Sequence, residues 1–253
     1  MSILKKEEIV RRTFPEFGIR VAGIMAAVAS LVTTQNALAI DSAAGPNLSG
    51  LWELRFDSAN VPPASLTSAM AAEDASVQYQ HDMTAIRWCH FMGVPYVMGV
   101  SPIDIVQNLN GKEVLITTPV RNPSRHIYTD GRQHVNPETF DPVSGGNSIG
   151  HWEGDTLVVD TVGFSSEGVT RIPGGGRRTP DSHLVERFRL VGGGNRLSVT
   201  FTWEDAKVFQ KPHTYEFRYY RAPKGTEQRE YDCNASDEAR SKYLLGAPGG
   251  ASK

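Results

Sequence analysis

Residues 103–118 read IDIVQNLNGKEVLITT, and this stretch decides the fold class. Asn110-Gly111 stands between two runs rich in β-branched residues. An Asn-Gly pair in that setting is the strongest short-range signal for a β-hairpin, because a tight hairpin turn needs residues that tolerate positive φ. We therefore expect one strand at 103–108 and its antiparallel neighbour at 113–118.

The same pattern recurs along most of the chain. Short runs of strand-forming residues alternate with Gly- and Asn-containing turns at 51–56, 125–129, 147–152, 156–164, 184–191, 196–203, 214–221 and 227–231. Only 65–79 has helical spacing, which predicts a short helix near the start of the mature chain. Regular hairpins without crossover helices are typical of an all-β, antiparallel sandwich or barrel.

Alternation within the late strands indicates which side chains share a face, because successive side chains of a strand point to opposite sides. Trp203 falls on an apolar face of its strand, and Tyr215, Phe217 and Tyr219 share a face of the next strand. The predicted interior is therefore aromatic. We expect these four residues to bind a small hydrophobic or aromatic substrate.

The composition excludes several classes of protein. The chain has 253 residues, of which 40% are hydrophobic, with 26 Lys and Arg against 28 Asp and Glu. This is ordinary globular composition, unlike that of collagen, coiled coils or disordered chains. A net charge of −2 argues against a nucleic-acid partner, since such proteins usually carry a basic excess. The charge gives no indication of oligomeric state.

The first 39 residues have the pattern of a secretory signal peptide. Five cations within residues 1–20 precede a short apolar run at 21–34 and the small-x-small sequence Ala37-Leu38-Ala39. Arg11-Arg12-Thr13-Phe14 is similar to the twin-arginine export motif, although an ordinary Sec signal is the alternative. We expect a periplasmic or secreted protein whose single domain spans 40–253, with a frayed tail from about 234. No later stretch is long and apolar enough to stay in a membrane.

Two cysteines, Cys89 and Cys233, are present. Because the predicted destination is oxidising, one disulfide between them is the simplest prediction, and two free buried thiols are the alternative. The spacing of His, Cys and acidic residues matches no metal-binding motif, so we expect no metal and no cofactor. Gly174–Arg178 is glycine-rich but lacks the strand–turn–helix setting of a phosphate-binding loop.

Two resemblances narrow the fold. Gly50-Leu51-Trp52 resembles the start of lipocalin-like (calycin-like) barrels, in which the tryptophan closes one end and a late arginine, here Arg221, packs on it. Much of the chain also resembles a family of exported bacterial proteins of no settled activity. The stretches concerned are LSGLW (48–52), RWCHFMGVP (87–95), IDIVQN (103–108), RHIYTDGRQH (125–134), NSIGHWEGDTLVVDTVGF (147–164), LVERFRL (184–190) and EYDC (230–233). The resemblance implies a small β-barrel.

Polar residues in two of these stretches are candidates for catalysis. Tyr128, which shares a strand face with His126, can donate a hydrogen bond to an oxyanion, and Arg132 follows it. His151 is a candidate general base, because an imidazole pKa near 6.5 suits proton transfer at neutral pH. Asp160 lies in an otherwise apolar strand and either faces water or pairs with an Arg or His in the cavity. The structural alternatives are a turn at Asp130-Gly131 and a hydrogen-bonded structural histidine.

Three functions fit this sequence. The first is an exported, cofactor-free enzyme with lyase, isomerase or hydratase chemistry on a hydrophobic or aromatic molecule, in which Tyr128 and His151 face a common pocket supported by Asp160 or Arg132. The second is a non-catalytic periplasmic carrier of such a ligand. The third is a structural barrel filled by its own side chains. His183, Glu186 and Arg187 lie at another strand start, where a solvated strand edge is the simplest interpretation.

Overall fold

The computed structural model describes residues 45–55, 59–73, 75–87, 91–99, 102–119, 124–136 and 138–228. The predicted signal peptide, Cys89, Cys233 and the predicted frayed tail lie outside these residues. The strands described are β1 (Gly50–Leu54), β2 (Ile103–Gln107), β3 (Glu113–Thr117), β4 (Arg125–Tyr128), β5 (Asn147–Glu153), β6 (Thr156–Val162), β7 (His183–Val191), β8 (Arg196–Glu204) and β9 (His213–Arg221).

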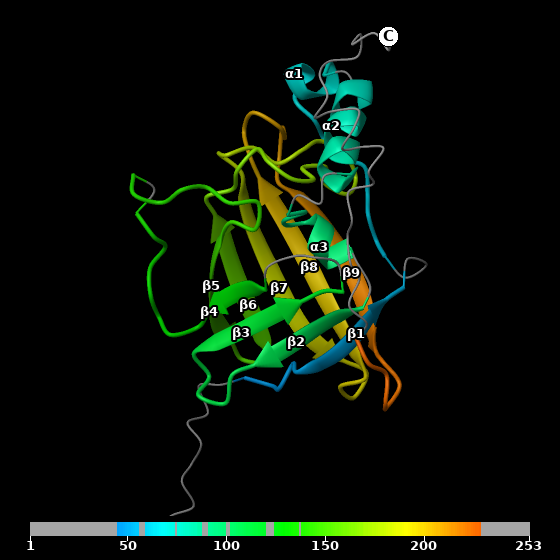
Figure 1. The fold of residues 1–253 in the computed structure, drawn as a ribbon, viewed down its shortest axis with the longest axis vertical. Helices are drawn as coiled ribbons and strands as arrows, with labels where there is room; N and C mark the ends of the chain where they lie inside the picture. The colour runs from blue at the N-terminus through cyan, green and yellow to red at the C-terminus, as the bar shows by residue number, and fades with distance from the viewer. Residues whose placement is uncertain are drawn as a thin grey trace, which may run out of the picture. The chain divides into compact units, whose positions relative to one another are not determined.

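These strands form a closed barrel in chain order, as the sequence predicted (Figure 1). Closure comes from antiparallel pairing of β9 with β1, in which Trp52 lies opposite Arg221. The Asn-Gly hairpin is present: the backbone N–H of Asn108 donates to the carbonyl of Glu113 at 2.9 Å, and Gly111 has a φ of 67°. Of the expected last strand at 227–231, residues 227 and 228 are not in a strand, and 229–231 lie outside the described residues.

One strand pair differs from the predicted antiparallel meander. β4 and β5 run parallel, with Ile127 opposite Ser148 and Tyr128 opposite Ile149. The turn at Asp130-Gly131 is present, with a φ of 82° at Gly131, but no strand begins after it. The chain instead follows the long connection 129–146 back to the end where β4 began, which a parallel neighbour requires.

The helical region also differs in its bounds. Two helices, α1 (Ser68–Ala71) and α2 (Ala75–Arg87), replace the single short helix expected at 65–79, and a third, α3 (Tyr96–Gly99), follows. α1 and α2 lie beyond one end of the barrel, and α3 lies close to its opening (Figure 1). The Thr67 hydroxyl accepts a hydrogen bond from the Met70 N–H at 3.2 Å and so caps α1.

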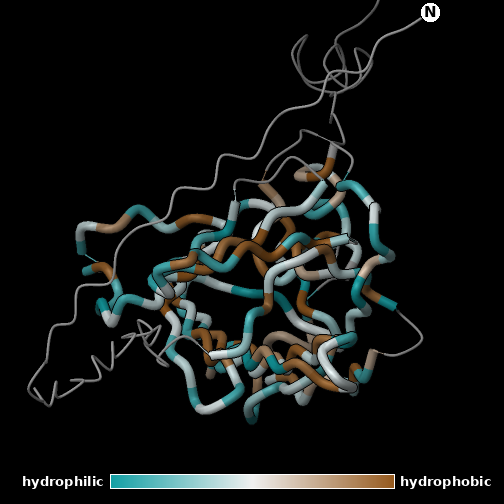
Figure 2. The backbone as a smooth tube through the Cα atoms, turned by 90° about the horizontal axis from the view of Figure 1, so that it is seen from below, coloured by the Kyte–Doolittle hydropathy of each residue, from teal (hydrophilic) through white to brown (hydrophobic). Residues whose placement is uncertain are grey.

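The barrel interior holds the core. Along β8 and β9 the buried residues alternate with exposed or half-buried ones. The backbone tube in Figure 2 changes repeatedly between hydrophilic and hydrophobic residues. Phe201 stacks on Tyr215 with ring centroids 4.8 Å apart and meets Phe217 edge-on at 5.2 Å. Full burial of an aromatic side chain stabilises a fold by about 2–3 kcal/mol, so this cluster is a major part of the core.

The contact expected from the lipocalin-like resemblance is present at one end of the barrel. The guanidinium carbon of Arg221 lies 4.2 Å from the centroid of the Trp52 ring. Trp52 is fully buried, and its indole N–H donates to the Leu48 carbonyl at 2.9 Å. The cation therefore lies over the ring of a buried tryptophan, as the resemblance implied.

Candidate functional site

A pocket of about 380 Å³ lies where β3 and β4 meet the connection that precedes β5. We call it the β4 pocket. Its walls are mainly apolar or small side chains, with three ionisable groups among them. The wall residues are Phe91, Gly93, Val94, Val97, Ile116, Thr118, Ser124, Arg125, His126, Tyr128, Phe140, Val143, Ser144, Gly145, Gly146, Asn147 and Ser148.

The outer face of β4 contributes a histidine and a phenol to this pocket. The rings of His126 and Tyr128 are stacked, with centroids 6.1 Å apart, because residues two apart on a strand share a face. His126 Nδ1 lies 2.7 Å from a carboxylate oxygen of Glu113 on β3. This contact orients the ring and leaves Nε2 as the nitrogen that Glu113 does not contact.

Arg132 covers the phenol of Tyr128. Its guanidinium carbon lies 3.8 Å from the centroid of the Tyr128 ring, and its Nη2 donates to Asp130 at 2.7 Å. The hydrogen bond from Arg132 lowers the pKa of Asp130, and the same bond raises the pKa of Arg132. The structure thus brings together two of the predicted catalytic residues, Tyr128 and Arg132.

The inner face of β4 contributes a buried ion pair that the sequence analysis did not anticipate. Arg125 borders the pocket, and its Nη1 donates to Glu186 Oε1 at 2.8 Å inside the barrel. Nη2 also donates to Thr161 at 3.1 Å and to Ser148 at 3.2 Å. Glu186 is fully buried, so the interpretation as a solvated strand edge is wrong for this residue. Its side chain points into the barrel, because it lies on the same face of β7 as the buried residues Leu184 and Phe188.

Asp160 stands in a different cluster, on the outer face of β6. It joins two histidines: His134 Nε2 lies 2.9 Å from Oδ1, and His183 Nε2 lies 3.0 Å from Oδ2. The hydrogen bond to His183 lowers the pKa of Asp160, and the same contact raises the pKa of His183. Asp160 therefore pairs with histidine, but it does so on the half-buried outer surface, so the predicted pairing inside the cavity is wrong in its location.

The outer ends of this cluster have further acceptors. His183 Nδ1 lies 3.2 Å from a Glu204 carboxylate oxygen, and His134 Nδ1 lies 2.8 Å from the Asn147 amide oxygen. The latter oxygen also accepts from the Val135 N–H at 3.4 Å, which identifies it as the acceptor. Both nitrogens of each ring thus face acceptors, and for His183 this agrees with the raised pKa.

His151 belongs to a third group. Its side chain is 64% exposed, and its Nε2 lies 3.1 Å from Glu153, which also pairs with Arg187. The hydrogen bonds of the described residues connect His151 to Glu153 and not to Tyr128, Asp160 or Arg132, and His151 is absent from the walls of the β4 pocket. The arrangement therefore presents His126, rather than His151, beside the phenol.

The four predicted substrate-binding aromatics all point into the barrel. Trp203 Nε1 donates to the Tyr215 hydroxyl at 3.3 Å, and the Tyr219 hydroxyl donates to the Met98 carbonyl at 2.5 Å. Burial raises the pKa of both tyrosines. Phe217 also borders a second pocket of about 670 Å³ at the barrel opening, which we call the mouth pocket. Its other wall residues are Ala59, Val61, Ile86, Pro95, Tyr96, Gly99, Val169, Arg171 and Pro173.

The described part of the chain contains no group of three or more His, Cys, Asp or Glu side chains arranged to hold a metal ion. Within the same residues, no helix has the length and apolar character needed to cross a membrane. In comparisons with known proteins, no protein-family profile matches the chain, and no curated protein is similar to it in sequence.

Proposed function

We propose that this protein is an enzyme that acts on a small, mainly apolar or aromatic molecule by cofactor-free proton transfer in the β4 pocket. The proposal rests on His126 and Tyr128, whose stacked rings both line the β4 pocket of about 380 Å³. A proton-transfer enzyme needs a base and a hydrogen-bond donor that converge on one void. His126, oriented by Glu113, and Tyr128 meet that requirement.

The corresponding reaction is a lyase or isomerase step next to a carbonyl group. Nε2 of His126 removes a proton from carbon, and the electron pair moves to the carbonyl oxygen, which accepts a hydrogen bond from the Tyr128 hydroxyl. In an isomerase, the imidazolium returns the proton to another carbon. In a lyase, the electron pair expels a leaving group at the β-carbon, and the imidazolium protonates it.

The sequence supports this location. The stretches 87–95, 125–134 and 147–164, on which the resemblance to exported bacterial proteins rests, each contribute wall residues to the β4 pocket. We propose membership of that family and export to the periplasm together with the activity. An extracytoplasmic enzyme for small molecules is consistent with a mechanism that uses no diffusible cofactor.

The second candidate function, a carrier, rests on the mouth pocket. Its volume of about 670 Å³ and its walls, which are apolar except for Arg171 and the Tyr96 hydroxyl, suit a hydrophobic ligand, and Phe217 connects it to the aromatic interior. A carrier needs a void with mainly apolar lining and no converging proton-transfer groups. The two functions therefore use different pockets, so they can be separated experimentally.

Hydrogen–deuterium exchange tests the proposed function without knowledge of the natural substrate. Aryl ketones are incubated with the protein in D₂O, and exchange at the acidic C–H is followed by NMR. Wild-type protein is expected to accelerate exchange, and His126→Ala is expected to slow it by about 10²–10⁴-fold, the usual contribution of positioned proton transfer. Tyr128→Phe should also reduce the rate. If His151→Ala slowed exchange by this factor and His126→Ala did not slow it, the base would be His151, the residue predicted from the sequence, and the proposal would be wrong.

Two glycines give matched blocking variants. A Cβ built at Gly145, in the β4 pocket, or at Gly99, in the mouth pocket, meets no atom within 4 Å, so each position has room for a larger side chain. Gly145→Phe is expected to abolish exchange, and Gly99→Phe is expected to preserve it. The carrier function would be favoured if the wild-type protein bound the ligand without catalysing exchange and only Gly99→Phe abolished that binding.

A further inference from the structure

A chain of polar contacts on the outer face of the barrel ends at a wall residue of the β4 pocket. Asp160 contacts both His134 and His183, and His134 Nδ1 in turn lies 2.8 Å from the side-chain oxygen of Asn147. Asn147 is the first residue of β5 and borders the pocket. The chain therefore connects the cluster at Asp160 with the proposed site.

These contacts set the orientation of the Asn147 amide. Its oxygen accepts a hydrogen bond from the Val135 N–H at 3.4 Å and also faces His134, so the oxygen end points toward the connection 129–146. The nitrogen lies at the other end of the planar amide and has two N–H donors. Within the described part of the chain, Nδ2 makes no hydrogen bond. It is therefore the group that Asn147 can offer to a ligand in the pocket.

The register of β4 and β5 places this amide beside the proposed base. Ile127 lies opposite Ser148 in the parallel pair. One residue earlier on each strand, His126 and Asn147 are therefore neighbours on the outer, less buried face, and both border the β4 pocket. Neighbouring strands lie about 4.8 Å apart, so the two side chains reach the same part of the pocket. His126 thus has a donor on two sides, with Tyr128 along β4 and Asn147 across on β5.

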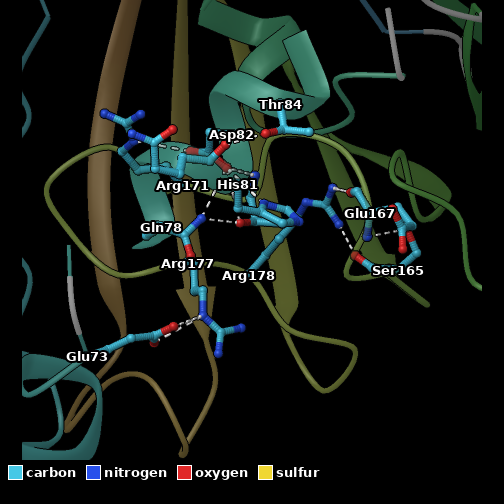
Figure 3. A network of polar contacts seen from close by, with 12 residues as sticks. Glu73, Gln78, His81, Asp82, Thr84, Ser165, Glu167, Arg171, Arg177 and Arg178 are labelled. Atoms are coloured by element: carbon cyan, nitrogen blue, oxygen red, sulfur yellow. Dashed lines mark hydrogen bonds and ion pairs between the residues drawn. The ribbon is translucent and has the colours of Figure 1, made fainter. Parts of the chain in front are cut away.

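A second polar network joins α2 to the connection between β6 and β7 (Figure 3). Its central residue, Asp82, is fully buried and borders neither the β4 pocket nor the mouth pocket. The carboxylate accepts from the Thr170 N–H and the Gln78 amide, each at 3.1 Å, and from Arg171 Nε at 3.3 Å. Both carboxylate oxygens are thus bound within the protein. This network holds α2 in place, whereas the chain at Asn147 ends in a donor at the wall of a pocket.

We propose that Asn147 binds the substrate of the β4 pocket through Nδ2, and that this substrate is a 1,3-dicarbonyl compound with an apolar or aromatic group. The inference rests on the proposed function of that pocket. In such a compound the acidic carbon lies between two carbonyl groups. When His126 Nε2 accepts the proton from that carbon, the electron pair spreads over both oxygens, and Tyr128 and Asn147 each donate to one of them. Hydrogen bonds to a charged oxygen are stronger than those to a neutral one, so both donors favour the enolate.

Isothermal titration calorimetry with 1-phenyl-1,3-butanedione tests this proposal. The reference ligand is 1-phenyl-1-butanone, which has the same carbon skeleton and one carbonyl group, and it is expected to bind at least tenfold more weakly. Asn147→Asp replaces the amide nitrogen by oxygen and keeps the acceptor that faces His134 and Val135. It is expected to lower the affinity for the diketone at least tenfold and to leave that for the monoketone within twofold. A residue that only held the connection in place would change both affinities alike.

Two kinds of control separate this effect from charge and from misfolding. Asn147→Leu removes the donor without adding a charge and should also lose the preference for the diketone. Asn136→Asp is the matched control, because the Asn136 side-chain oxygen accepts the Glu138 N–H at 3.0 Å in the same connection, away from the pocket walls, and both affinities should stay unchanged. Gly145→Phe should abolish binding of both ligands, and Gly99→Phe should preserve it. Thermal unfolding checks that each variant folds.

The outcomes distinguish this inference from the proposed function. Absence of diketone binding, equal affinity of the wild-type protein for the two ligands, an equal loss of both in Asn147→Asp, or a retained preference in Asn147→Leu would overturn the role of Asn147. The proposed function would still stand if His126→Ala slowed exchange of aryl ketones. A preference for the diketone that depends on Asn147, in a protein that does not accelerate exchange, would instead refute the enzyme and support binding by Asn147.

Discussion

Replacing Glu186 by glutamine removes the negative charge that faces Arg125 inside the barrel. The Arg125 and Glu186 side chains are 6% and 0% exposed, so water cannot replace the lost partner. The hydroxyls of Ser148 and Thr161 would remain as neutral acceptors for the guanidinium. They do not carry the opposite charge that a buried cation requires.

The burial of both groups sets the size of the effect. Removal of one member of a buried ion pair destabilises a protein by about 3–5 kcal/mol, because the other charge stays buried without compensation. For a domain of 150–250 residues, each kcal/mol lowers the melting temperature by about 2–4 °C. We therefore expect Glu186→Gln to lower it by about 6–20 °C.

Denaturant unfolding of Glu186→Gln, Arg125→Met and the double variant measures this effect and its origin. Because the double variant carries no unpaired charge, it is expected to be less destabilised than the sum of the single variants. Glu153→Gln is the matched control, since Glu153 pairs with Arg187 on the exposed face next to Glu186 and should change stability little. Additive losses, or a loss in Glu186→Gln no larger than in the control, would refute the reasoning.

Two further predictions concern the outer surface and the contact of Arg221 with Trp52. The pKa of His183 is raised from 6.5, and the pKa of Asp160 is lowered from 3.8. Their pairing therefore stabilises the fold fully between pH 3.8 and pH 6.5. This stabilisation is lost as the pH rises through the raised pKa of His183 or falls through the lowered pKa of Asp160. In a plot of the unfolding midpoint against pH, Asp160→Asn should therefore reduce the decline at both ends. Parallel curves for the variant and the wild-type protein would contradict this. Arg221→Ala should destabilise by about 0.5–1 kcal/mol, because the cation over Trp52 is lost from an exposed site. Denaturant unfolding measures this effect, and an unchanged midpoint would be the contrary result.

The candidate site was only partly accessible from the sequence. The period-two pattern at 125–129 placed Tyr128 and His126 on one face, and their stacking in the β4 pocket agrees with that pattern. The pattern gave no reason to prefer His126 over His151. That preference depends on which loops surround each residue, and segments 91–97 and 140–148, distant in sequence, form the walls beside His126.

The fold class, the positions of the nine strands from β1 to β9 and the aromatic interior followed from the sequence alone, whereas the strand expected at 227–231 is not formed at 227 and 228. Turn chemistry and alternation are local properties of the chain, which is why they could be predicted. The parallel pairing of β4 with β5, the ion pair of Arg125 with Glu186, and the bridging of two histidines by Asp160 were decided only by the tertiary structure. Alternation assigns a side chain to a face of its strand. It does not say which residue of another strand lies opposite, because closure of the barrel and the path of the long connection 129–146 determine that register.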